Sequence, residues 1–133
     1  MSGPETNCRA WLAKAENDLL NIENNLSAAR IPWDTICFHA QQAAEKALKA
    51  VLIANGIPFG KVHNLKTLLD LLPQDTALPP KVQDAASLTD YAVSRRYPGD
   101  FEPITRNEAK KAVKIAREIR NEIRDKLPKS VLG

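Results

Sequence analysis

The sequence predicts an all-α fold, an up-and-down bundle of four long helices and one short helix in a single domain over residues 1–133. Three observations predict this class. Apolar residues recur at spacings of three and four over long stretches, which is the period of an amphipathic helix. No segment shows the sustained alternation of a half-buried strand. Aromatic residues make up only 5% of the chain, which suits close helix packing through small side chains.

The first helix is predicted over residues 2–29. Ser2 and Glu5 fit a capping box at its start, and Pro4 is tolerated in a first helical turn. Pro32 ends the helix, because the residue before a proline is pushed out of the helical region. One apolar seam runs along it through Leu12, Ala15, Leu19, Ile22, Leu26 and Ala29.

The second helix is predicted over residues 33–55, and it is apolar around most of its circumference. Gly56 is its natural C-cap, because glycine adopts the left-handed conformation without a Cβ clash. A short helix over residues 65–72 follows, with Asn64 as its N-cap and Pro73 as its stop.

A fourth long helix is predicted over residues 79–96, where two prolines suit the first turn, and a loop over 97–103 follows it. Thr105 and Glu108 form a second capping box, which starts a last helix that runs to residue 127. The predicted outer face of this last helix is strongly basic, with Lys110, Lys111, Lys114, Arg117, Arg120 and Arg124.

Composition sets wide limits on function. The net charge of +3 and the pI near 9.0 permit an anionic partner without requiring one. Cys8 and Cys37 have no metal-ligand or disulfide spacing, so we expect both to be small buried or half-buried residues. The sequence has no signal-peptide pattern and no apolar run long enough to span a bilayer, so we expect a cytosolic protein.

Cofactor and metal sites are also not indicated. The two histidines, His39 and His63, stand in no metal-ligand spacing, and no Cys-x-x-Cys pair exists. No glycine-rich phosphate loop and no Gly-x-Ser-x-Gly elbow are present. We therefore expect no metal and no cofactor.

The second predicted helix carries a polar ridge, which we define as His39, Gln42, Lys46 and Lys49. The spacings of three, four and three place these side chains within an arc of about 80°. No acidic residue is interleaved on that line, since Glu45 lies beside it. The ridge is either a solvated face, the simpler interpretation for a lone helix, or the lining of a groove for an anion.

Two other segments offer donors to an anion. His63 precedes the short helix, where the simpler interpretation is a residue of the capping segment that packs on a neighbour. Arg95, Arg96 and Tyr97 lie at a predicted helix end before a proline, and such a group can clamp a phosphate and stack on a base. Cations at a helix C-terminus are also favoured by the helix dipole alone.

These blocks, taken in order, resemble a known family. The stretch Phe38-His-x-Gln-Gln-x-x-Glu-Lys-x-Leu-Lys49, then His63-x-Leu65, then Arg96-Tyr-Pro98, is similar to the HEPN family (higher eukaryote and prokaryote nucleotide-binding domain). The resemblance covers roughly residues 10–127. It implies a bundle of four or five helices, often dimeric, commonly encoded beside a minimal nucleotidyltransferase as a toxin–antitoxin-like pair.

Many HEPN proteins are metal-independent ribonucleases that use an arginine followed, after four to six residues, by a histidine. This sequence departs from that motif, because eight residues separate Arg30 from His39 and no histidine follows the later arginines. The Arg96-Tyr97-Pro98 block resembles the non-nuclease branch, for which nucleotide binding is the usual proposal.

We therefore expect a non-catalytic nucleotide- or nucleic-acid-binding module, a homodimer that works with a nucleotidyltransferase. The basic residues would engage phosphates, and the others would hydrogen-bond the ligand or stack on a base. A pure protein-interaction module is the first alternative, and a ribonuclease that uses His39 or His63 is the second. The candidate ligand-binding residues are His39, Gln42, Lys46, Lys49, His63, Arg95, Arg96 and Tyr97.

Overall fold

The computed structural model describes residues 4–76, 78, 88, 104–127 and 129. This part of the chain is all-helical, with three long α-helices, one short α-helix and a 3-10 turn. The predicted long helix over residues 79–96 and the loop over 97–103 lie outside the described residues. The elements are α1 (Pro4–Leu26), α2 (Trp33–Ala54), α3 (Leu65–Asp70), η1 (Gln74–Thr76) and α5 (Arg106–Lys126).

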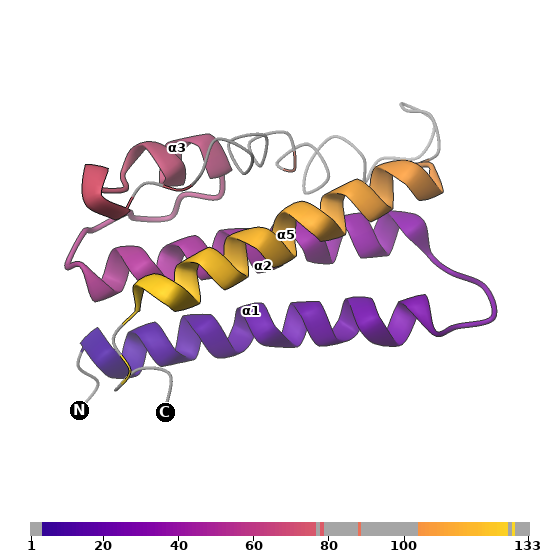
Figure 1. Cartoon of the computed structure of the whole chain (residues 1–133), viewed down its shortest axis with the longest axis horizontal. Coiled ribbons are helices and arrows are strands. Elements are labelled where there is room, and N and C mark those ends of the chain that lie inside the picture. The colour runs from indigo at the N-terminus through magenta and orange to yellow at the C-terminus, as the bar shows by residue number, and fades with distance from the viewer. Residues whose placement is uncertain (1–3, 77, 79–87, 89–103, 128, 130–133) are drawn as a thin grey trace.

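Helix α2 is the centre of the arrangement. It packs along α1 on one side and along α5 on another, whereas α1 and α5 contact each other little. Figure 1 shows α1 and α2 antiparallel, as predicted for neighbours joined by a short connection, and α5 running in the same direction as α2. Beyond the C-terminal end of α2 the chain turns back, so that the short α3 contacts α2.

The ends of α1 and α2 follow from local chemistry. Helix α1 ends at Leu26, three residues before the predicted end, and the Ser27 hydroxyl there donates to the Glu23 carbonyl at 3.1 Å. After α2, Gly56 takes the expected positive φ of 70°. The Gly56 N–H donates to the Ile53 carbonyl at 3.0 Å and the Ile57 N–H to that of Leu52 at 2.9 Å, which is the Schellman pattern.

The predicted N-caps of α3 and α5 are both confirmed. The Asn64 side chain accepts a hydrogen bond from the Thr67 N–H at 3.2 Å, and that of Thr105 accepts from the Glu108 N–H at 3.1 Å. Helix α3 ends at Asp70, two residues before the predicted end. The sequence did not predict η1, where the Thr76 N–H donates to the carbonyl of Pro73 at 3.0 Å.

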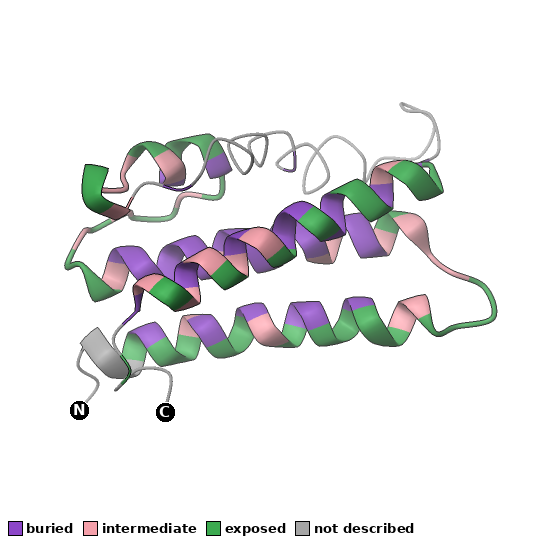
Figure 2. Cartoon of the chain, viewed as in Figure 1, coloured by how far each residue is buried: buried purple, intermediate pink, exposed green. Residues whose placement is uncertain are grey.

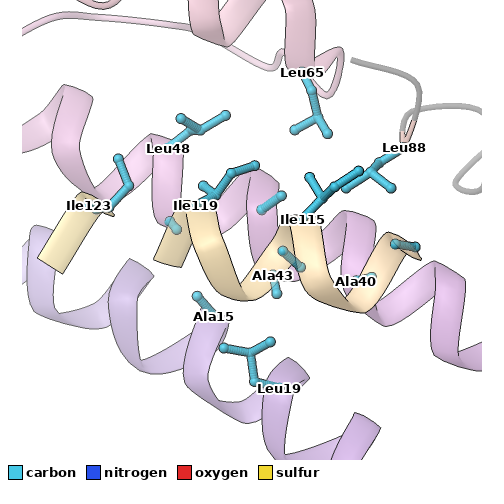
Figure 3. Packing of buried hydrophobic residues seen from close by; sticks show 14 of the residues in the cluster. Ala15, Leu19, Ala40, Ala43, Leu48, Leu65, Leu88, Ile115, Ile119 and Ile123 are labelled. Carbon is cyan, nitrogen blue, oxygen red and sulfur yellow. The ribbon is translucent and has the colours of Figure 1, made fainter. Parts of the chain in front are cut away.

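The core is built around small residues of α2. Five alanines of α2 have no exposed surface, so the flanking helices can approach α2 closely. Leucine and isoleucine side chains from α2 and α5 fill the remaining space, as Figure 3 shows for Leu48, Ile119 and Ile123. Figure 2 shows how the buried surface of α1 is confined to one face. The five alanines are Ala40, Ala43, Ala44, Ala47 and Ala50.

Cys8 and Cys37 are both buried thiols outside any disulfide, as the sequence predicted. None of the helices in the described ranges has the length and apolar content needed to cross a membrane.

Candidate functional site

A buried aspartate on α1 organises the polar ridge of α2. Asp18 lies beside the apolar seam of α1, next to Leu19, and only 6% of its surface is exposed. Its Oδ1 accepts a hydrogen bond from His39 Nδ1 at 2.8 Å, and its Oδ2 accepts one from Lys46 Nζ at 2.7 Å. The ridge therefore faces α1, and the side chains of His39 and Lys46 are each 21% exposed.

The pairing follows from the helical spacing. His39 and Lys46 are seven residues apart, which is close to two turns, so they lie on one face and reach the carboxylate from either side. A buried carboxylate is costly without such partners. An ionised carboxylate only accepts hydrogen bonds, so Nδ1 of His39 carries the proton. The Nε2 atom of the neutral ring is then left as an acceptor.

A second buried carboxylate, that of Glu45, accepts hydrogen bonds from other residues of the site. It is 3% exposed, and its Oε1 accepts from Gln41 Nε2 at 3.1 Å. Its Oε2 accepts from Lys49 Nζ and from His63 Nδ1, each at 3.2 Å. Gln42 joins this network by donating from Nε2 to Gln41 Oε1 at 2.6 Å.

Lys49 is enclosed within the fold. Only 3% of the residue is exposed, and its ammonium lies 5.1 Å from the ring centroid of Trp11 and 5.3 Å from that of Phe59. The two rings meet edge to face, with centroids 6.2 Å apart. An ammonium between aromatic faces and a carboxylate is stabilised without water. Lys49 therefore ties α1, α2 and the segment before α3 together.

His63 is the exposed member of the site. Its side chain is 72% exposed, although its Nδ1 is hydrogen-bonded to the carboxylate of the buried Glu45. Because Nδ1 faces the carboxylate, Nε2 is the nitrogen left free to meet a ligand.

No acid is interleaved on the ridge itself, but two carboxylates beside it pair with its lysines. Asp18 comes from a different helix, so the pattern of α2 alone did not reveal it, and Glu45 reaches Lys49 one turn away. The two carboxylates balance the two lysines, so the ridge is not a row of free cations. Lys49 in particular is a buried ion-pair partner.

The structure brings five of the predicted site residues into two hydrogen-bonded groups along α2, which together we call the polar seam. Asp18 joins His39 to Lys46, and Glu45 joins Lys49 to His63. Gln42 connects to the second group through Gln41. Sequence reasoning missed the three connecting residues, and one signal was available: a charged Asp18 directly beside the apolar seam of α1. Arg95, Arg96 and Tyr97 lie outside the described residues.

A separate ion pair fastens α5 to α1. Arg120 donates from Nε and Nη2 to the two carboxylate oxygens of Glu16 at 2.6 and 2.8 Å, and the Arg124 guanidinium lies 3.8 Å from the same carboxylate. This hydrogen bonding raises the pKa of Arg120 above its ordinary value. The sequence placed Arg120 on the outer face of its helix, but the side chain is half-buried and clamps two helices.

No group of three or more histidine, cysteine, aspartate or glutamate side chains is placed to hold a metal ion within the described ranges. The seam's donor set is one of hydrogen bonds and ion pairs, which suits a polar or anionic organic ligand.

Comparisons with known proteins agree with the fold. The chain is 29% identical over 135 residues to "Putative toxin MJ1304" of Methanocaldococcus jannaschii, with 88% of this chain and 86% of that protein covered. The crystal structure of TT1696 from Thermus thermophilus superposes with a TM-score of 0.78 at 34% identity, covering 90% of this chain and 98% of that one. ST0689, an archaeal HEPN homologue, superposes with a TM-score of 0.73 at 27% identity, covering 96% and 100%.

The family model for the HEPN domain matches residues 8–126, which include α1, α2, α3 and α5 almost entirely. This match spans the whole polar seam, from Asp18 to His63. The chain therefore belongs to the HEPN domain family.

Proposed function

We propose that this HEPN domain is a non-catalytic module that binds a nucleotide or nucleic acid, works as a homodimer, and pairs with a minimal nucleotidyltransferase in a toxin–antitoxin-like system. The name of the M. jannaschii relative, "Putative toxin MJ1304", supports the toxin–antitoxin part. The polar seam supports the ligand-binding part, because several of its groups keep hydrogen-bonding capacity after their internal pairing.

The orientation of the two histidines carries the proposal. In each ring Nδ1 is hydrogen-bonded to a buried carboxylate, so the orientation of the imidazole is fixed before any ligand binds. A side chain that is already ordered loses less entropy on binding. His63 is the more accessible of the two, at 72% exposure against 21% for His39. We assign ligand contacts to Nε2 of both rings and to the half-buried amide of Gln42.

The two lysines take different roles. Lys46 uses one of its three N–H donors on Asp18 and is 21% exposed, so it can also donate to a phosphate oxygen. Lys49 is buried, so it positions Glu45 and does not touch the ligand. Apart from the histidines the seam has no net charge, because Lys46 and Lys49 balance the carboxylates of Asp18 and Glu45.

Calorimetric titration of nucleoside triphosphates and short oligonucleotides tests the proposal. His63→Ala and Lys46→Gln should each weaken binding about tenfold, the loss expected for one hydrogen bond involving a charged group. Lys66→Gln is the matched control, because Lys66 is exposed nearby and pairs only with Asp70 among the described residues. Lys46→Glu is unsuitable, because a second carboxylate would lie beside Asp18 and disturb the fold.

Added salt should weaken the binding of a phosphate ligand. If no nucleotide or oligonucleotide binds the wild-type chain more tightly than about 1 mM, the nucleotide proposal is wrong.

A metal-independent ribonuclease is a second candidate, and one observation favours it. An exposed imidazole held from behind by a buried carboxylate, as His63 is by Glu45, is the arrangement that a general base uses. RNA incubated with the purified chain in chelator should stay intact if the first proposal holds. Cleavage that is lost in His63→Ala but kept in Lys66→Gln would establish the nuclease instead.

A further inference from the structure

A groove of about 350 Å³ lies away from the polar seam, lined by the C-terminal end of α1, the N-terminal end of α2 and residues 109–121 of α5. We propose that this groove is a docking site for an acidic amphipathic helix of a partner protein. The proposal does not rest on nucleotide binding at the seam, because the two sites share no residue.

The floor of the groove is apolar. Leu26 and Trp33 line it from the two sides of the α1–α2 connection, and both are only partly buried. Ile36 and Val113 contribute the buried part of the floor. An accessible apolar floor bounded by polar residues is typical of a surface that takes apolar side chains from a partner.

One wall of the groove is a row of cations from α5. Lys110, Lys114 and Arg117 are spaced at four and three residues, so they lie on one helix face along about 10 Å. All three are exposed, and none pairs with an acid elsewhere in the described part of the chain. With one acid, Glu118, the lining carries three positive charges against one negative, a net +2. This charge complements a partner with an acidic flank.

The floor favours a helical peptide over a nucleic acid. Base edges carry polar groups that would find no partner over Leu26, Ile36 and Val113, and such unsatisfied groups cost binding energy. A helix with leucines at i, i+4 and i+7 can place them along the floor while its acidic residues meet the α5 cations.

Fluorescence anisotropy with designed peptides tests this site. The probe is a labelled peptide of about 14 residues with leucines at i, i+4 and i+7 flanked by glutamates, and the comparison peptide has lysines in place of the glutamates. We expect the acidic peptide to bind and the basic one to bind at least about tenfold more weakly. The double variant Lys110→Glu/Lys114→Glu should reverse this preference.

Two further variants make the test specific. Lys111→Glu is the matched control, because Lys111 is exposed on the same helix but does not line the groove. It should change the affinity for the acidic peptide far less than the double variant does, because it does not line the groove and exposed charges that make no direct contact contribute little. Trp33→Ala removes the indole from the floor and should weaken the binding of the acidic peptide about tenfold. Circular dichroism checks that this variant is folded.

Three results would overturn the proposal. The first is failure of the acidic peptide to bind below about 1 mM, or equal binding of both peptides. The second is displacement of the peptide by oligouridylate, which would make the groove a nucleic-acid site. The third is a dimer in light scattering that Trp33→Ala converts to monomer without any peptide binding, which would assign the groove to a second copy of this chain.

Discussion

Replacing Asp18 by asparagine should destabilise the fold by about 2 kcal/mol. Asparagine keeps the shape of the side chain but brings an NH2 donor to a place where His39 and Lys46 both donate. One of these two hydrogen bonds is then lost, or the His39 ring changes tautomer so that Nδ1 accepts, and in either case Lys46 loses its counter-charge.

The magnitude follows from the burial of the three groups. Removing one partner of a fully buried ion pair costs about 3–5 kcal/mol, and a hydrogen bond to a charged group is worth about 1.5–3 kcal/mol. Asp18 is 6% exposed, but His39 and Lys46 are 21% exposed and can recover some contact with water. The lower end, about 2 kcal/mol, is therefore expected, which for a domain of this size lowers Tm by roughly 8 °C.

Urea denaturation followed by circular dichroism measures the effect, with Asp70→Asn as the control. Asp70 pairs with Lys66 at 3.0 Å, but both side chains are exposed, so its replacement should cost less than about 0.5 kcal/mol. If the two variants unfold within about 0.5 kcal/mol of each other, Asp18 does not organise the seam as its geometry indicates.

Three further predictions concern the backbone, a helix cap and a thiol. Gly56→Ala should lower the free energy of unfolding, measured by urea denaturation, by about 1 kcal/mol. The cause is backbone strain at φ 70° alone, since no atom lies within 4 Å of the added Cβ. An unchanged urea midpoint would contradict this. Thr105→Ala should lower the free energy of unfolding by about 1 kcal/mol, because it removes the cap on the Glu108 N–H. Melting curves measure this effect, with Thr67→Ala as the control, since the Thr67 side chain caps no helix in the described residues. Burial raises the pKa of the Cys8 thiol above 9.0, so the unfolded thiol ionises first and stability should fall as pH rises past that value; Cys8→Ala should show a shallower decline between about pH 8 and pH 10.

The sequence was sufficient for the helices of the described region, because their periodicity and caps are local. Asn64, Thr105 and Gly56 each mark a boundary through a hydrogen bond or a φ angle within a few residues. The early end of α1 and the η1 turn depend on weaker local contacts, of Ser27 and Thr76, that carry no strong sequence signal.

The site was less predictable, because its pairing is tertiary. The residues of α2 that the sequence singled out do lie in hydrogen-bonded groups, but the carboxylate that His39 and Lys46 share belongs to Asp18, 21 positions from His39 and 28 from Lys46. The periodicity of one helix cannot show which residue of another helix faces it. The same holds for Arg120, which was expected at the surface and instead pairs with Glu16, 104 positions away.

NMR of the imidazole nitrogens during ligand titration tests the central proposal most directly. On adding a nucleoside triphosphate or a short oligonucleotide, we expect the Nε2 signals of His39 and His63 to shift, while their Nδ1 signals, held by Asp18 and Glu45, move much less. Nitrogen signals of both histidines that stay unchanged up to about 1 mM ligand would contradict a nucleotide site at the polar seam.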